Sequence, residues 1–170
     1  MDNFKIDLKE LKEGQTELSF RLDDAFFSSL EDVELSHGLL RSDVSVRRID
    51  SLFKLHFHTE GTVTVPCDLC LDDMDQPVST DNELVCKLGE ETRMDDDLVI
   101  VSEEEGILDV AWFLYESIAL NIPIRHVHAP GKCNPAMMKV LQEHSATRSG
   151  VEDESKAVDS RWAALSKLKN

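Results

Sequence analysis

A period-two alternation of apolar and polar residues runs through residues 39–65 and limits this chain to a fold built on β-strands. Successive side chains of a strand point to opposite faces of a sheet, so the pattern predicts two long strands with one buried face. Residues 49–51 predict the turn between them, and we place a β-bulge at Gly61. The residues expected to point inward are Val44, Val46, Phe53, Leu55, Phe57, Val63 and Val65.

Shorter apolar patterns extend this sheet. Alternation predicts strands at residues 4–8 and 17–22, with Gly14 and Gln15 as turn residues between them. A returning strand is expected over residues 78–88, and the apolar run at 98–101 predicts a buried strand between acidic loops. We therefore expect an α+β protein whose mostly antiparallel sheet has five to seven strands, flat or curled into an open barrel.

Helical spacing of apolar residues appears in three places. Asp23 and Asp24 precede a run that predicts a short helix within residues 24–35. Asp109 opens the main packed helix, residues 109–120, which Pro123 closes. Its Trp112 and Tyr115 are expected in the core. Trp162, Leu165 and Leu168 fall on one face of a third predicted helix, at residues 160–170.

The charge is distributed unevenly along the chain. The 170 residues include 34 acidic and 18 basic ones, a net charge of -16, and 41% hydrophobic residues are enough for a core. Residues 1–130 carry 11 bases and 29 acids, hence -18, whereas residues 131–170 carry 7 and 5, hence +2. We expect a single domain over residues 1–144, a flexible polar linker at 145–159 and a short helical tail at 160–170.

This charge argues against several kinds of partner. A polyanion is repelled at long range by so acidic a chain, which argues against DNA and against RNA held by bulk electrostatics. The N-terminus is charged throughout, and the longest apolar stretch, residues 110–115, is far shorter than the roughly 18 residues that span a bilayer. We therefore expect a cytoplasmic protein that does not associate with membranes.

Two cysteines at the predicted tip of a hairpin have the spacing of half a zinc site. Cys67 and Cys70 are separated by two residues, so one tight turn can direct both thiolates at a single ion. His128 and Cys133, in an irregular segment, could supply the other two ligands and complete a Cys3His site for zinc. His126 is an alternative to His128, and partly buried free thiols remain the alternative to a metal.

Enzymatic interpretations have less support in the sequence. A redox Cys-x-x-Cys needs to open a helix, but acidic residues and Pro77 follow this one. Cys86 lies in an alternating strand, where packing is its expected role. No phosphate-binding glycine loop or nucleophile elbow is present, so we name no catalytic residues and rank a thiol or zinc enzyme last.

An ordered set of motifs gives the chain a resemblance to a known family. In sequence order they are Val65-Pro66-Cys67-Asp68-Leu69-Cys70-Leu71, an acidic stretch, Gly106-Ile107-Leu108-Asp109 opening a helix with Glu116, Leu120-Asn121-Ile122-Pro123, His128-x4-Cys133 and Arg161-Trp162-Ala163-Ala164-Leu165. This order resembles the YceD family of large ribosomal RNA subunit accumulation proteins over residues 40–170. The chain departs from the family in having Asp68 and Leu69 where a basic residue is often found.

The resemblance implies a non-enzymatic role in ribosome assembly. It implies no catalytic residues, and the family's cysteines map onto Cys67, Cys70 and Cys133, which favours zinc. An acidic surface suits a basic ribosomal protein or a pre-ribosomal large subunit as partner. Direct contact with ribosomal RNA is the alternative, through small basic spots at Arg47-Arg48, at Arg125-His126 and in the tail from Arg161 to Lys169. The tail residues expected to touch a partner are Arg161, Trp162, Lys167 and Lys169.

Overall fold

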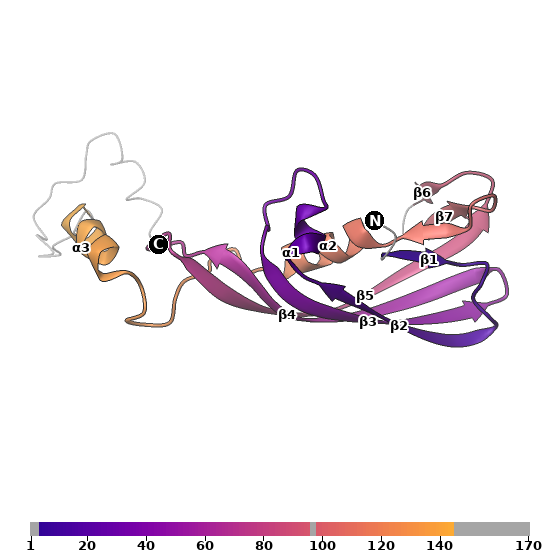
Figure 1. The fold of residues 1–170 in the computed structure, drawn as a ribbon, viewed down its shortest axis with the longest axis horizontal. Coiled ribbons are helices and arrows are strands. Elements are labelled where there is room, and N and C mark those ends of the chain that lie inside the picture. Colours follow the sequence, from indigo (N-terminus) through magenta and orange to yellow (C-terminus); the bar gives the residue numbers. More distant parts are fainter. Residues whose placement is uncertain (1–3, 96–97, 145–170) are drawn as a thin grey trace, which may run out of the picture. The chain divides into compact units, whose positions relative to one another are not determined.

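The computed structural model describes residues 4–95 and 98–144. It is an α+β structure, with about 48% of the residues in strands, as the sequence predicts. The described residues form three helices and two sheets, arranged as Figure 1 shows. The strands are β1 (Lys5–Asp7), β2 (Gly14–Leu22), β3 (Gly38–Ile49), β4 (Leu52–Pro66), β5 (Asp73–Gly89), β6 (Arg93–Asp95), β7 (Leu98–Ser102) and β8 (Ile107–Asp109). The helices are α1 (Asp24–Ser28), α2 (Ala111–Asn121) and α3 (Pro135–His144).

The main sheet has six strands in the order β2-β3-β4-β5-β7-β6. All neighbours are antiparallel except β5 and β7, which run parallel. Strands β2 and β6 form the two edges, so the sheet is open and is not closed into a barrel. Strands β1 and β8 pair antiparallel in a separate two-stranded sheet.

Strands β3, β4 and β5 form the long meander that the alternation predicts. Every predicted inward residue of β3 and β4 is buried, while Lys54 and His56 between them are exposed and the polar Thr59 is buried with the core residues. The predicted bulge is wrong, because Leu40 and Val78 pair with Gly61 in an uninterrupted register. Glycine is needed there for another reason: a Cβ would lie 2.4 Å from the Leu39 carbonyl oxygen.

Helices α1 and α2 cover the buried face of the sheet. Phe26 and Phe27 of α1 are buried, and the Phe113 ring of α2 lies 4.8 Å from the Phe57 ring on β4. The Asp109 carboxylate accepts a hydrogen bond from the Ala111 N–H, but Asp109 itself ends β8, so α2 begins two residues later than predicted. Together these contacts close one hydrophobic core between the helices and the sheet.

Three local predictions need correction. Gly14 and Gln15 are not turn residues, because they begin β2 and pair with β3. Helix α1 ends at Ser28, since residues 29–37 form a loop fixed by a hydrogen bond from the Glu34 N–H to the Tyr115 hydroxyl. Trp112 is 54% exposed, whereas its neighbour Tyr115 is buried as expected.

The chain divides into two compact units, residues 1–138 and 139–170. Helix α3, which the sequence did not predict, spans their boundary and is capped by the Asn134 carboxamide oxygen. The predicted linker at 145–159 and the helical tail at 160–170 lie outside the described residues. None of the helices in the described part of the chain combines the length and apolar character that a bilayer crossing requires.

Candidate metal centre

The turn between β4 and β5 places two cysteines side by side. Pro66 ends β4, and the Cys67 N–H then donates to the Asp72 carbonyl, while the Leu71 N–H donates to the Cys67 carbonyl. Leu71 adopts a left-handed conformation, with φ of 63°. This tight turn carries Cys67 and Cys70 at the hairpin tip, as the sequence predicts, and both side chains are buried.

The segment that follows α2 is fastened to this tip through Asp68. The Asp68 N–H donates to the His126 carbonyl at 3.0 Å, and the His126 N–H donates to the Asp68 carboxylate at 2.7 Å. Further along, the Asn134 carboxamide donates to the Asp72 carboxylate at 3.0 Å. These hydrogen bonds lie on either side of His128 and Cys133 and hold the chain between them against the turn.

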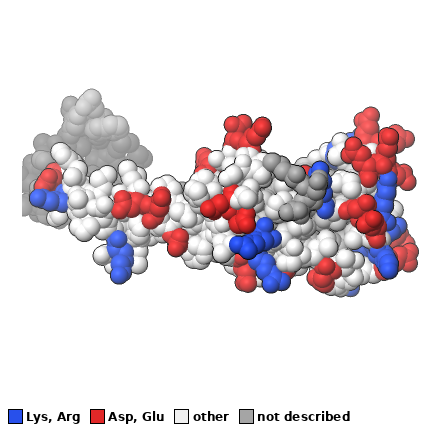
Figure 2. Space-filling model, in the orientation of Figure 1, with Lys and Arg blue, Asp and Glu red and all other residues white. Residues whose placement is uncertain are grey.

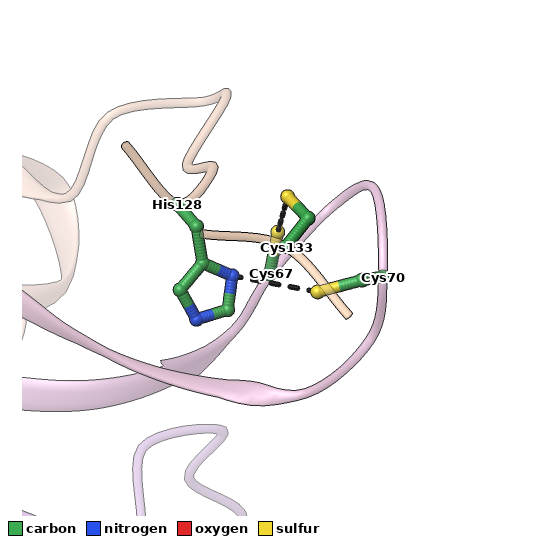
Figure 3. A group of neighbouring side chains, drawn as sticks. All are labelled: Cys67, Cys70, His128 and Cys133. Carbon is green, nitrogen blue, oxygen red and sulfur yellow. Dashed lines mark hydrogen bonds between the residues drawn. The ribbon is translucent and has the colours of Figure 1, made fainter. Parts of the chain in front are cut away.

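Figure 3 shows the four side chains converging from the two segments. The Cys67 and Cys133 sulfurs are 3.9 Å apart, and the Cys70 sulfur lies 3.4 Å from Nδ1 of His128. All four potential ligand atoms lie within 4.8 Å of one another. The four cysteines of the chain are free thiols, so no disulfide competes for these sulfurs.

The pKa values of the two nearest thiols differ because their surroundings differ. Burial opposes ionisation of Cys67, but N–H groups of Cys70, His128 and Leu69 point at its sulfur and lower its pKa to about 6. Burial, together with hydrogen bonds to Cys67 and Cys70, raises the pKa of Cys133 to about 11. Metals bind thiolates, so the turn prepares Cys67 as the first ligand.

The donor set fits zinc. Three sulfurs and one imidazole nitrogen are a common ligand set for structural zinc, and tetrahedral Zn–S bonds of about 2.3 Å put two sulfurs roughly 3.8 Å apart. The Cys67–Cys133 separation of 3.9 Å agrees with that spacing. Four protein ligands leave no open position for a substrate, so the cluster suits a structural ion that ties residues 123–134 to the sheet.

The structure separates the alternatives that the sequence left open. His128, and not His126, joins the cysteines. The His126 ring faces the Asp68 carboxylate and the Pro123 carbonyl instead. Cys86 is fully buried in the core, where burial raises its pKa to about 12. The predicted partner-binding residues Arg161, Trp162, Lys167 and Lys169 lie outside the described residues.

Sequence reasoning missed the residues that hold the two segments together. Asp68 lies inside the Cys-x-x-Cys motif, where the sequence suggests a role for its charge alone. Its contact with His126 joins residues 58 positions apart, which no local pattern reveals. Asn134 directly before Pro135 is a helix-start signal that could have predicted α3.

Comparison with known proteins agrees with the motif order. A family model described as the large ribosomal RNA subunit accumulation protein YceD matches residues 55–169, which include both halves of the metal centre. Searches of curated proteins and of solved structures gave no match. Because the family model covers well over half of the chain, the protein belongs to the YceD family and has its role in large-subunit ribosomal RNA accumulation.

Proposed function

We propose that this protein is a non-enzymatic assembly factor that binds a basic ribosomal protein, alone or on a pre-ribosomal large subunit. The observation that carries the proposal is the charge of residues 1–130, which is -18 from 11 bases and 29 acids. Figure 2 shows several separate groups of acidic side chains on the visible face, with basic side chains among them. Such a surface attracts a cationic protein and raises the rate of encounter.

Three of the described arginines make contacts within the fold that weaken the alternative, direct binding of RNA. Arg41 pairs with Asp43 at 2.9 Å, and Arg21 pairs with Asp23 at 3.5 Å. Arg48, one of the predicted basic spots, donates to the Leu11 carbonyl and stacks 5.4 Å from the centre of the Phe53 ring. These guanidinium groups are engaged within the fold, which makes them poorer phosphate ligands.

The proposed zinc ion has a structural role in this account. Cys67, Cys70, His128 and Cys133 would hold it, and its bonds would add folding free energy by joining the hairpin tip to the segment after α2. A site with four protein ligands offers no position for a reacting water or carbonyl. The arrangement therefore supports a binding protein over a hydrolase.

The test is capture from lysate by the full-length, zinc-loaded chain at low and at high salt. We expect basic large-subunit proteins, or precursors that contain them, to be retained at low salt and released at high salt, because exposed charges are screened. Recovery of no large-subunit component under either condition would contradict the proposal.

A further inference from the structure

An apolar pocket lies where the C-terminal end of α2 meets the end of β4. We call it the α2 pocket; its volume is about 320 Å³. Its walls include Leu35, Val65, Tyr115, Ala119, Ile122 and Ile124. A pocket of this size and character accepts a large apolar side chain.

Apolar residues on and just after α2 are exposed. Ile124, which lines the pocket and follows the helix, is fully exposed, and Leu120, near the end of the helix, is 78% exposed. Trp112 is 54% exposed on the same helix, with its ring 5.5 Å from that of Tyr115. A hollow beside several exposed apolar residues is typical of an interaction site.

The charges around the α2 pocket indicate what kind of partner it suits. Glu34 lines the pocket, and Glu31 and Asp32 precede it in the loop after α1, where Figure 2 shows a group of acidic side chains. Glu116 follows Tyr115 on α2, and Arg125 is the basic residue beside Ile124. Counted together, Glu34 and these sequence neighbours of the lining residues comprise four acids and one base, a charge of -3, which favours a cationic partner.

We propose that the α2 pocket receives an apolar side chain carried by a basic segment of the ribosomal protein that this chain engages. The inference rests on the proposed function and names the surface that performs it. An apolar anchor in a desolvated pocket supplies affinity, and the surrounding opposite charges supply orientation and speed.

The position of the pocket connects it to the metal centre. Ile124 and His126 line one wall, and the same His126 is held by Asp68 at the hairpin tip. That wall therefore belongs to the segment that the four ligands would fasten to the sheet. Loss of the metal is expected to loosen the wall and weaken partner binding as well.

The experiment compares two variants with the same change in charge. Ile124→Asp places a carboxylate at the pocket, whereas the control Met94→Asp places one on β6, at a side chain that is 73% exposed. Both variants become more acidic, so general attraction to a basic partner is equal in the two. The zinc-loaded full-length proteins are titrated with proteins extracted from purified large ribosomal subunits, and bound proteins are quantified by mass spectrometry.

We expect Ile124→Asp to bind at least about tenfold more weakly than Met94→Asp, with unchanged zinc content and thermal midpoint. Equal binding by the two variants would overturn this inference and leave the proposed function intact. Failure of the unmodified chain to bind any of the extracted proteins would instead overturn the proposed function. Light scattering that shows a dimer dissociated by Ile124→Asp would identify a second copy as the occupant and also overturn the inference.

Discussion

At the scale of single residues, the candidate metal centre depends on backbone groups as much as on its potential ligands. Three N–H groups and the His128 side chain lower the pKa of Cys67 to about 6, which favours the thiolate form that metals bind. Asp68 binds no metal, yet it holds the chain that carries His128. Such supporting contacts orient ligands and contribute to affinity.

The two neighbouring histidines allow a matched test of the ligand set. We expect His128→Ala to lose most of its zinc, because one of four ligands is removed, and His126→Ala to keep one zinc per chain. Zinc per chain is measured by mass spectrometry of elements after dialysis against metal-free buffer. Equal zinc content in the two variants would contradict the assignment of His128.

A second prediction at this scale concerns His58, on the exposed face of β4. A hydrogen bond to Asp81 at 2.9 Å is the main cause that raises the pKa of His58 above 6.5, with Asp81, Glu60 and Asp43 adding electrostatic support. The protonated ring therefore adds stability below about pH 6.5, and this contribution is lost as pH rises through the folded-state pKa.

The measurement is an NMR titration of the His58 ring. We expect a midpoint above 6.5 that moves back toward that value in Asp81→Asn, because the hydrogen-bonding charge is gone. Asp75→Asn, on the same strand but outside this group of charges, serves as the control. A midpoint that both variants leave unchanged would show that Asp81 is not the cause.

At the scale of elements, the meander of β3, β4 and β5 supports both ends of the functional region. It contributes the buried face on which α2 packs, and its last turn carries Cys67 and Cys70. The register of β4 with β5 is continuous from Leu52 to Pro66. A substitution that disturbs β4 at one position is therefore expected to destabilise the whole meander.

Gly61 is where this expectation can be tested. An alanine there would place its Cβ 2.4 Å from the Leu39 carbonyl oxygen and hold a φ of +150°. We expect Gly61→Ala to lower the free energy of unfolding by about 2 kcal/mol or more in a urea titration. Gly14→Ala has a φ of +110° but no atom within 4 Å of the new Cβ, so about 1 kcal/mol is expected. Equal losses in the two variants would contradict this explanation.

The helices and strands also show which parts of the fold can be predicted from the sequence. Alternation at Val44–Val46 and Phe53–Phe57 predicts β3 and β4, because one buried face imposes the period directly. The spacing of Cys67 and Cys70 predicts half of the metal centre. Two strand pairings could not be predicted: β1 with β8, about 100 residues apart, and β5 with β7, which run parallel. Both follow from tertiary packing, which leaves no local pattern in the sequence. Exposure of Trp112 likewise depends on how α2 is rotated against the sheet.

At the scale of the whole molecule, residues 1–138 are strongly acidic. Within them, the hairpin tip between β4 and β5 is attached to the segment that follows α2. The hairpin tip and the segment after α2 are joined by few backbone hydrogen bonds, so the proposed zinc ion would contribute much of their attachment. The α2 pocket is assembled from three separate stretches of chain, so no local sequence pattern predicts it.

Removing the metal should therefore have a local effect. We expect a chelator under reducing conditions to speed amide hydrogen exchange in residues 67–72 and 124–134, where the Asp68 and His126 N–H groups lose their fixed partners. Exchange in β3 and in the first half of β4 should stay slow, because the core does not depend on the tether. Unchanged exchange throughout after full loss of zinc would contradict a structural role.

The central claim is that this acidic chain acts on the large subunit through protein and not through bare RNA. The most direct measurement titrates the zinc-loaded full-length chain, at one ionic strength, against domain-sized large-subunit RNA fragments and, separately, against proteins extracted from that subunit. The account predicts saturable binding to a basic protein and an RNA affinity no higher than that of an unrelated acidic protein. Tight binding to the RNA fragments, with none to the extracted proteins, would contradict it.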